Sequence, residues 1–260
     1  MEQSLSIVTY NLRCLWNGDG VNSFCHRAGL ILEKISDEQP DIICFQEAWD
    51  ENMAFLKRHL KPNYTVIFNQ RCEGLTGEGL AVAFRNDRIT LYGLDIFWLS
   101  ETPRVVASRF EGQSVHPRIC QNMIFKDEMT GKVFRIYNLH LEDISEAVRV
   151  RQMQTVFERL VADRAENELP FFILGDLNAQ PGGEVMTYCY ENAPFSFCDL
   201  TEEIPVSFHD FGRLLPGVKI DYIITDEKVS ACPHTVSCWM DCTNGIFLSD
   251  HYPIRLDITL

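Results

Sequence analysis

The stretch Phe171–Asn178 constrains this chain most, because a short apolar run passes directly into polar residues. Phe171–Leu174 is a continuous apolar segment, which predicts a strand buried on both faces. Gly175 then permits a sharp turn, and an acid and an amide follow at Asp176 and Asn178. Asp and Asn are also common turn residues, so this stretch alone does not establish a functional site. Other strands must end in the same way.

Five further predicted strands carry Asn, Asp, Glu or His at or near an end. Leu5–Tyr10 ends at Asn11, Asp41–Phe45 ends before Glu47, Val133–Tyr137 ends before His140, Lys219–Ile224 contains Asp221, and Asp250 and His251 precede Pro253–Leu260. Carboxylate, amide and imidazole groups are the side chains of a phosphoesterase site that uses a hard cation. Core packing alone does not explain why the same types recur at so many strand ends.

The ordered motifs TYNLR, QE, NLHL, GDLN, IDYI and SDH resemble the endonuclease/exonuclease/phosphatase superfamily of metal-dependent phosphoesterases. The resemblance extends from Thr9 to His251. Leu99–Pro103 and Ser207–Phe211 further resemble a deadenylase-like or exonuclease-like bacterial branch. The alternation of strands and helices predicts an α/β protein and leaves a doubly wound sheet open. The resemblance implies instead a four-layered sandwich of two mixed β-sheets flanked by helices, with the site at one open end between the sheets.

The resemblance also implies a metal site. Glu47 is expected to be the principal ligand of Mg²⁺ or Mn²⁺, with Asn11 beside it and Asp250 as a further ligand. Mg²⁺ prefers oxygen ligands and keeps several waters, so a few carboxylates suffice. The number of metal ions stays open. Glu142 stands where the deadenylase-like branch usually has Asp, and its role also stays open.

Five residues are expected to act on the phosphoryl group. The resemblance implies that Asp176 orients or deprotonates the attacking water, while Asn178 holds the phosphate or a metal-bound water. His251 would face the phosphoryl group, with Asp221 behind it to fix the tautomer and orientation of the imidazole. His140 would approach the phosphate from the other side. Taken alone, His140 is better explained as a core histidine, and its place in the ordered motif set reverses that preference.

Four residues outside these motifs are candidate substrate contacts. Arg118 follows a long irregular segment, Glu101–Pro117, and could bind phosphate through two parallel hydrogen bonds. His116 lies at the end of that segment. His209 and Phe211 lie on a loop before the IDYI strand and could line a leaving-group pocket by stacking on a base or sugar. Packing within the loops is an equally good explanation for each of them.

The composition restricts the partners. The chain has 260 residues and a formal net charge of −14. We expect one domain spanning residues 1–260, because no change in composition divides the chain. Proteins that bind long nucleic acids neutralise phosphates with Lys and Arg, and the one basic cluster here, Lys57–Lys61, fits a solvated helix face. We therefore expect a small phosphoester or a short single-stranded nucleic acid as substrate, and no duplex DNA. The oligomeric state stays open.

The location is expected to be cytoplasmic. The chain begins Met1–Glu2–Gln3 without a signal-peptide pattern, and no apolar run approaches the roughly 20 residues of a membrane span, so we expect no membrane contact. The ten cysteines are scattered through apolar segments, which predicts reduced, buried thiols. Cys238 and Cys242 are the most closely spaced pair, and no CxxC motif indicates a zinc site.

These observations favour a hydrolase, either a phosphodiesterase or a phosphatase, in which a metal-organised water attacks a small phosphoester. A 3′-exonuclease acting on single-stranded RNA or DNA is the alternative, and a hydrolase of phospholipid head groups is a third reading. A non-catalytic binding protein that keeps the fold would be expected to have lost site residues. The motif residues are all present, which disfavours that reading.

Overall fold

Two six-stranded sheets form the centre of the protein in the computed structural model, which describes residues 4–74 and 76–260. Met1–Gln3, on which the expectation about a signal peptide partly rests, and Leu75 lie outside the described residues. The first sheet has the order β11 (His234–Cys238), β14 (Ile254–Ile258), β1 (Leu5–Asn11), β2 (Ile42–Trp49), β4 (Glu78–Arg85) and β3 (Tyr64–Gln70). The second has the order β5 (Ile89–Trp98), β6 (Ile119–Asp127), β7 (Val133–His140), β8 (Phe171–Asp176), β10 (Asp221–Asp226) and β9 (Phe197–Asp199).

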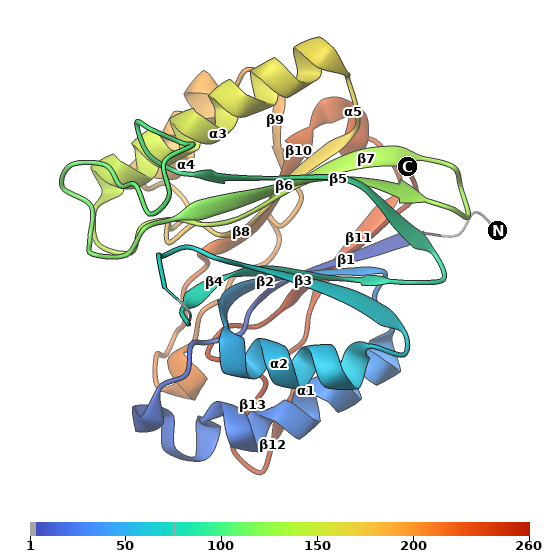
Figure 1. Ribbon diagram of the computed structural model, residues 1–260, viewed down its shortest axis with the longest axis vertical. Coiled ribbons are helices and arrows are strands. Elements are labelled where there is room, and N and C mark those ends of the chain that lie inside the picture. Colours follow the sequence, from blue (N-terminus) through green and yellow to red (C-terminus); the bar gives the residue numbers. More distant parts are fainter. Residues whose placement is uncertain (1–3, 75) are drawn as a thin grey trace.

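Helices cover the outer face of each sheet (Figure 1). The helices α1 (Phe24–Glu38) and α2 (Asp50–Leu60) pack on the first sheet, and α3 (Glu146–Glu166) and α4 (Glu184–Asn192) pack on the second. Both sheets are mixed, because β1 pairs with β2 and β7 with β8 in parallel while the other neighbours are antiparallel. The four-layered sandwich implied by the family resemblance is confirmed, and the doubly wound sheet is excluded.

Short elements complete the described chain. They are the 3₁₀ helices η1 (Asn17–Asn22) and η2 (Asp210–Gly212), the one-turn helix α5 (Glu227–Ser230), and a small hairpin of β12 (Cys242–Thr243) and β13 (Ile246–Phe247). No described helix has both the length and the apolar character that crossing a bilayer requires.

Alternation along the central strands explains how the layers pack. In β8, Phe172 and Leu174 join the core between the two sheets, whereas Phe171 and Ile173 join the core under α3 and α4. Successive side chains of a strand point to opposite faces, so a strand between two layers is apolar at every position. The predicted strand buried on both faces is therefore confirmed.

Gly175 allows two strands to approach each other closely and does not form the predicted turn. It lies inside β8, paired with Leu139 and Tyr222, so the predicted sharp turn at this residue is wrong. Its φ is +136°, and a Cβ atom there would lie 1.9 Å from the carbonyl oxygen of Leu139. Only glycine lets the backbones of β7 and β8 approach this closely.

Several predicted strand ends are also wrong. β2 continues through Glu47 to Trp49, and β7 continues through Asn138 to His140. In β2 the pairing register with β4 shifts between Phe45 and Ala48, which marks a bulge, and Glu47 has a left-handed φ of +53°. Bulges re-aim side chains next to active sites. These polar residues thus lie near the ends of continuous strands, where hydrogen bonds to the neighbouring strands fix their backbone positions.

The cysteine prediction is partly correct. The ten cysteines are all free. Cys44, Cys120 and Cys189 are buried, but Cys25 and Cys242 are exposed, so the expectation of buried thiols is wrong for these two. Cys25 lies in the first turn of α1 and Cys242 begins the short strand β12.

Candidate active site

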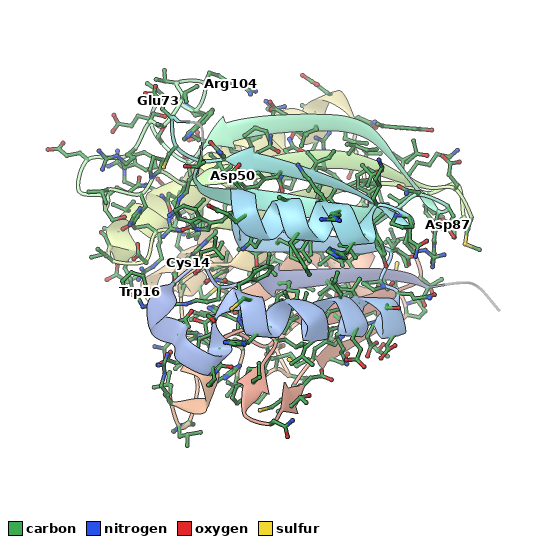
Figure 2. All side chains as sticks on the ribbon, turned by 60° about the horizontal axis from the view of Figure 1, so that its bottom comes forward. Cys14, Trp16, Asp50, Glu73, Asp87 and Arg104 are labelled. Carbon is green, nitrogen blue, oxygen red and sulfur yellow. The ribbon has the colours of Figure 1, made fainter. Side chains whose placement is uncertain are left out.

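The predicted motif residues converge at one end of the sandwich, around a cavity of about 290 Å³. Both sheets and the loops after them supply its walls: Arg13, Cys14, Glu47, Arg71, Glu78, His116, Arg118, His140, Asp143, Asp176, Asn178, Phe208, Ile220, Asp250 and His251. Figure 2 shows Cys14 at this end and Asp87 at the opposite end. A larger groove of about 560 Å³ lies near Asp87, but it contains none of the predicted site residues.

Glu47 is held from two directions. Its Oε1 accepts a hydrogen bond from Asn11 Nδ2 at 3.1 Å, and its Oε2 accepts one from the backbone N–H of Cys14 at 2.6 Å. Burial opposes ionisation of Glu47, but His251, the Cys14 amide and Asn11 outweigh it and lower its pKa. Glu47 is therefore a carboxylate in a fixed orientation at the wall of the cavity.

Asp250 faces the same side of the cavity. Its Oδ2 lies 3.5 Å from Arg13 Nη1, and its Oδ1 accepts a hydrogen bond from Ser249 Oγ at 3.1 Å. Burial raises the pKa of Asp250, and the nearby Glu47 raises it further while His251 and Arg13 lower it. The two carboxylates thus repel each other in a nearly dry site, which favours a cation between or beside them.

The donor chemistry fits a hard divalent cation. Among the described residues, Asp176, Asp221 and His251 offer ligand atoms that lie within 4.8 Å of one another. Two of these residues already share a hydrogen bond, Asp221 with His251, which leaves the carboxylate of Asp176 as the oxygen donor of that group. Glu47, Asp250 and the Asn11 amide add further oxygens, and such oxygen-rich sets suit Mg²⁺ or Mn²⁺.

Asp176 lies at the centre of the polar cluster. Its Oδ1 accepts from the backbone N–H of Asn178 at 2.8 Å, and its Oδ2 accepts from Asn11 Nδ2 at 3.0 Å. The same Oδ2 lies 3.6 Å from His140 Nε2 and 3.8 Å from His251 Nε2. Burial, with a contribution from the nearby Asp221, raises the pKa of Asp176 to about 7. A carboxylate with that pKa can take up and release a proton near neutral pH.

Asn178 and His140 form a pair across β7 and β8. Asn178 Nδ2 lies 3.1 Å from His140 Nε2 and donates to the carbonyl oxygen of Leu141 at 3.1 Å. Burial and the positive charge of Arg118 lower the pKa of His140 well below its usual value. His140 is therefore neutral, and its Nε2 can accept the hydrogen bond from the Asn178 amide.

His251 carries the opposite protonation state. Its Nδ1 lies 2.8 Å from Asp221 Oδ2, and both residues are buried. Burial opposes the charged imidazole, but Asp221 outweighs it, and the pKa of His251 rises to about 10. Asp221 thereby holds an imidazolium whose Nε2 points toward Asp176 and the cavity.

The predicted substrate contacts divide into two groups. Arg118 and His116 line the cavity. His209 and Phe211 do not, so their prediction as a leaving-group pocket is wrong. His209 Nδ1 accepts from the Gly212 amide at 3.0 Å and its ring stacks on Tyr252 at 3.9 Å, while Phe211 is buried against Arg27. The neighbouring Phe208 lines the cavity instead, with its ring 4.9 Å from that of His251.

The structure adds residues that sequence reasoning missed. Arg13 lines the cavity and belongs to the TYNLR motif, so that motif could have identified it as a site residue. Arg71 and Glu78 form an ion pair of 2.8 Å at the ends of the β3–β4 hairpin, and no motif marked them. Glu142, whose role was open, is fully buried and accepts hydrogen bonds from the N–H and hydroxyl of Ser114 at 3.1 and 2.9 Å. It anchors the irregular segment that leads to Arg118.

Comparison with known proteins finds a matching family and several similar structures. The sequence profile of the Endonuclease/Exonuclease/phosphatase family matches residues 8–251. An endonuclease/exonuclease/phosphatase from Bacteroides vulgatus is 26% identical, with a TM-score of 0.88 and 99% of both chains covered. A mannosyl-6-phosphatase from Bacteroides thetaiotaomicron is 25% identical, with a TM-score of 0.84 over 99% of this chain and 100% of that one. The human Nocturnin catalytic domain shares the fold, at 18% identity and a TM-score of 0.76 over 98% and 93%.

Proposed function

Because the chain belongs to the Endonuclease/Exonuclease/phosphatase family, whose members hydrolyse phosphoester bonds, we propose that it is a Mg²⁺- or Mn²⁺-dependent hydrolase of a small phosphoester. One observation supports this most strongly. Glu47, Asp176 and His251 face one cavity in three different electrostatic states: an ionised acid, an acid with a pKa of about 7, and an imidazolium. Phosphoester hydrolysis needs a metal ligand, a base and a proton donor.

Glu47, Asp250 and Asn11 are the residues that we propose to hold the metal. When bound there, Mg²⁺ or Mn²⁺ would supply Lewis-acid neutralisation of the phosphoryl oxygens. Asn11 also donates to Asp176 at 3.0 Å, so it links the proposed metal ligands to the proposed base. This link keeps the Asp176 carboxylate in one orientation.

Asp176 is proposed to position the attacking water and accept its proton. The water oxygen forms the new bond to phosphorus as the bond to the leaving oxygen breaks on the opposite side. Asn178 lies beside this path, with its φ of +49° and its amide fixed by Leu141 and His140. Both hydrogens of its Nδ2 are donated to these two acceptors, so its Oδ1 is the atom that we propose to accept a hydrogen bond from a water in the cavity.

His251 is proposed to donate a hydrogen bond to the phosphoryl group and to give its Nε2 proton to the leaving oxygen, which balances the proton that Asp176 takes from the water. Its Nε2 is free of the Asp221 hydrogen bond, which uses Nδ1, and it points into the cavity. The neutral His140 lies 3.6 Å from Asp176 Oδ2 and is proposed to fix the orientation of the Asn178 amide.

A small phosphoester is the favoured substrate class. The formal net charge of −14 disfavours long nucleic acids, and the similar structure from Bacteroides thetaiotaomicron is a mannosyl-6-phosphatase. The segments Leu99–Pro103 and Ser207–Phe211, which resemble the deadenylase-like branch, favour the second candidate, a 3′-exonuclease on single-stranded RNA or DNA.

Two substrates distinguish these candidates. Wild type and Asp176→Asn would be compared on bis-p-nitrophenyl phosphate and on a labelled single-stranded oligoadenylate, each with Mg²⁺. We expect wild type to cleave this activated small diester, more slowly than it would a monoester, and to leave the oligonucleotide intact, and we expect the variant to lose at least about a hundredfold in kcat. Trimming from the 3′ end that disappears in Asp176→Asn would make the protein a nuclease. An active Asp176→Asn enzyme would contradict the assigned base.

A further inference from the structure

Two buried arginines form one wall of the active-site cavity, and the proposed reaction uses neither. Arg71 follows β3 directly and Arg118 precedes β6 directly, so strand ends fix both backbones. The two residues are only 6% and 3% exposed, yet both line the cavity that contains His140, Asp176 and His251. Buried arginines are rare unless they are paired or bind a ligand.

Their protein partners use only part of each guanidinium. Arg71 Nη1 lies 2.8 Å from Glu78 Oε1, and Arg118 Nη2 lies 3.0 Å from Asp143 Oδ1. The buried Nε atoms of both residues have no hydrogen-bond partner among the described residues. A small void of about 10 Å³ between the two side chains has room for no more than about one water molecule. The carboxylate oxygen Glu142 Oε2 lies 4.0 Å from Arg118 Nε, which is too far for a hydrogen bond, so both Nε–H groups are unused within the part of the chain that the structure describes.

The two arginines also repel each other. Burial lowers the pKa of Arg118, and the charge of Arg71 lowers it further. Both arginines likewise disfavour the charged form of His140. Two guanidinium groups held together in this way form a site for an anion. A bound anion relieves their repulsion and accepts hydrogen bonds from their unused N–H groups.

The cavity thus has two walls of opposite charge. Glu47, Asp176 and Asp250 form the acidic wall, where the metal is proposed to bind, while Arg71 and Arg118 lie on the opposite, basic wall beside their partners Glu78 and Asp143. Burial raises the pKa of Glu78 to about 7, so this acid offsets only part of the charge of the two arginines near neutral pH. A phosphodiester carries one negative charge, whereas a phosphomonoester carries nearly two at neutral pH because its second pKa is about 6. The second negative charge of a monoester would face Arg71 and Arg118, on the wall away from the proposed metal ligands.

We propose that Arg71 and Arg118 form an anion subsite that binds a second negative charge of the substrate, so that the enzyme selects a terminal phosphomonoester over an internal diester. This inference rests on the proposed phosphoester hydrolysis and adds the charge of the substrate. His116 lies at the rim of the same wall and would contact the group that carries the phosphate. A second charge could also come from a neighbouring phosphate on the same molecule, and the experiment separates these two sources.

Three substrates test the subsite by turnover. They are p-nitrophenyl phosphate, the diester thymidine 5′-(p-nitrophenyl phosphate), and the same diester with an added 3′-phosphate. Wild type, Arg71→Gln and Arg118→Gln would be compared with Arg58→Gln, which removes an equal charge from the exposed face of α2. We expect the ratio of kcat/KM for monoester over diester to fall roughly tenfold or more in the two cavity variants and to stay unchanged in Arg58→Gln.

Each other outcome overturns part of the proposal. An equal fall of kcat/KM on the monoester and the diester would show that the arginines do not distinguish substrates by their charge. A preference only for the 3′-phosphorylated diester, lost in the cavity variants, would assign the second charge to a neighbouring phosphate and overturn the monoester assignment. If Arg118→Gln fails to fold, Arg118→Lys keeps the charge without the planar fork, and it is expected to lose part of the selectivity.

A binding measurement separates this inference from the proposed function. Inorganic phosphate would be titrated calorimetrically into Mg²⁺-loaded wild type and variants, which requires no turnover. We expect both cavity variants to bind phosphate roughly tenfold more weakly than wild type and Arg58→Gln. Equal affinities would overturn the subsite. A wild type that binds phosphate through these arginines but hydrolyses none of the three substrates would contradict the proposed function alone.

Discussion

Three residues of the site adopt backbone conformations that side chains rarely take. Arg13, Glu47 and Asn178 have φ values of +62°, +53° and +49°. Non-glycine residues in this region cost free energy, and they persist where the surrounding structure holds them for a purpose. Arg13 and Asn178 each lie two residues after a strand, Glu47 lies at the bulge in β2, and all three line the cavity. Two of the three, Glu47 and Asn178, are residues to which we assign a role in the reaction.

The pairing of Asp221 with His251 gives a prediction for a single residue. Replacing Asp221 with Asn removes the carboxylate that raises the pKa of His251 to about 10, while burial continues to favour the neutral imidazole. We therefore expect the pKa of His251 to fall in Asp221→Asn. NMR titration of the imidazole nitrogens in chelator-treated protein measures it. An unchanged pKa would mean that Asp221 does not control the charge of His251.

Single residues also show what sequence reasoning can and cannot reach. The motif residues were predictable because short-range patterns mark strand ends, and the structure brings them together. Arg71 and Glu78 were not, because their positions depend on the pairing of β3 with β4. On the loop before β10, Phe208 enters the cavity whereas His209 and Phe211 pack inward. A loop has no fixed alternation from which this difference could be read.

At the scale of elements, one arginine joins the two loops that carry metal-site residues. Arg27 on α1 is completely buried and donates Nη1 to the carbonyl oxygens of Leu12 at 2.9 Å and Leu248 at 2.7 Å. Leu12 follows Asn11, and Leu248 lies two residues before Asp250. The helix thus fixes the spacing of both loops.

Arg27→Met should therefore destabilise the fold and loosen the two loops that carry Asn11 and Asp250. Several buried carbonyl groups would lose their donor, so we expect the free energy of unfolding to fall by roughly 2–4 kcal/mol. Urea denaturation measures this, with the exposed Arg58→Met as the matched control. An Arg27→Met protein as stable as the control would show that the hydrogen bonds of Arg27 do not fasten these loops.

A second arginine, Arg88, links the two sheets through ion pairs with Asp127 and Asp41, which we call the clasp. Arg88 donates Nε and Nη2 to the carboxylate of Asp127 on β6 at 3.1 and 2.8 Å, and its Nη1 to Asp41 before β2 at 2.8 Å. Burial would raise the pKa of Asp127, but the hydrogen bonds from Arg88 outweigh it and lower that pKa. The clasp therefore requires the ionised form of Asp127.

The pH dependence of stability tests this clasp. Because the pKa of Asp127 is lower in the folded protein, its contribution is fully present above the unfolded value of about 3.9. The contribution is lost as the pH falls through the folded value. We expect Asp127→Asn to be less stable than wild type at pH 7 by about 1–3 kcal/mol, with the difference shrinking in acid. A difference that stays constant down to acid pH would contradict the role of ionisation.

At the scale of the whole molecule, the fold was predictable through the order of its motifs, and the layer packing followed from strands that are apolar on both faces. On the basic wall of the cavity, Arg118 was a predicted phosphate contact, but its neighbour Arg71 was not predictable, because their proximity depends on how the two sheets meet. The charge of the whole chain still bears on the partner. With a formal net charge of −14, the protein should repel long polyanions.

Duplex DNA should therefore bind weakly or not at all. We expect a Kd above about 10⁻⁴ M at physiological salt, the weak limit of non-specific DNA binding. Fluorescence anisotropy of a labelled short duplex measures it, with a single-stranded oligonucleotide of the same length as control. Micromolar binding of the duplex that weakens with added salt would show that local basic groups outweigh the net charge.

The most direct measurement is the return of activity when metal is added to chelator-treated protein. Wild type and Glu47→Gln would be treated with EDTA, and phosphoester hydrolysis would be followed as Mg²⁺ or Mn²⁺ is restored. We predict that wild type is inactive in chelator and recovers with metal, while Glu47→Gln folds normally and recovers little, because the neutral amide replaces the principal ligand. Full wild-type activity in EDTA would contradict the proposed metal-dependent hydrolysis.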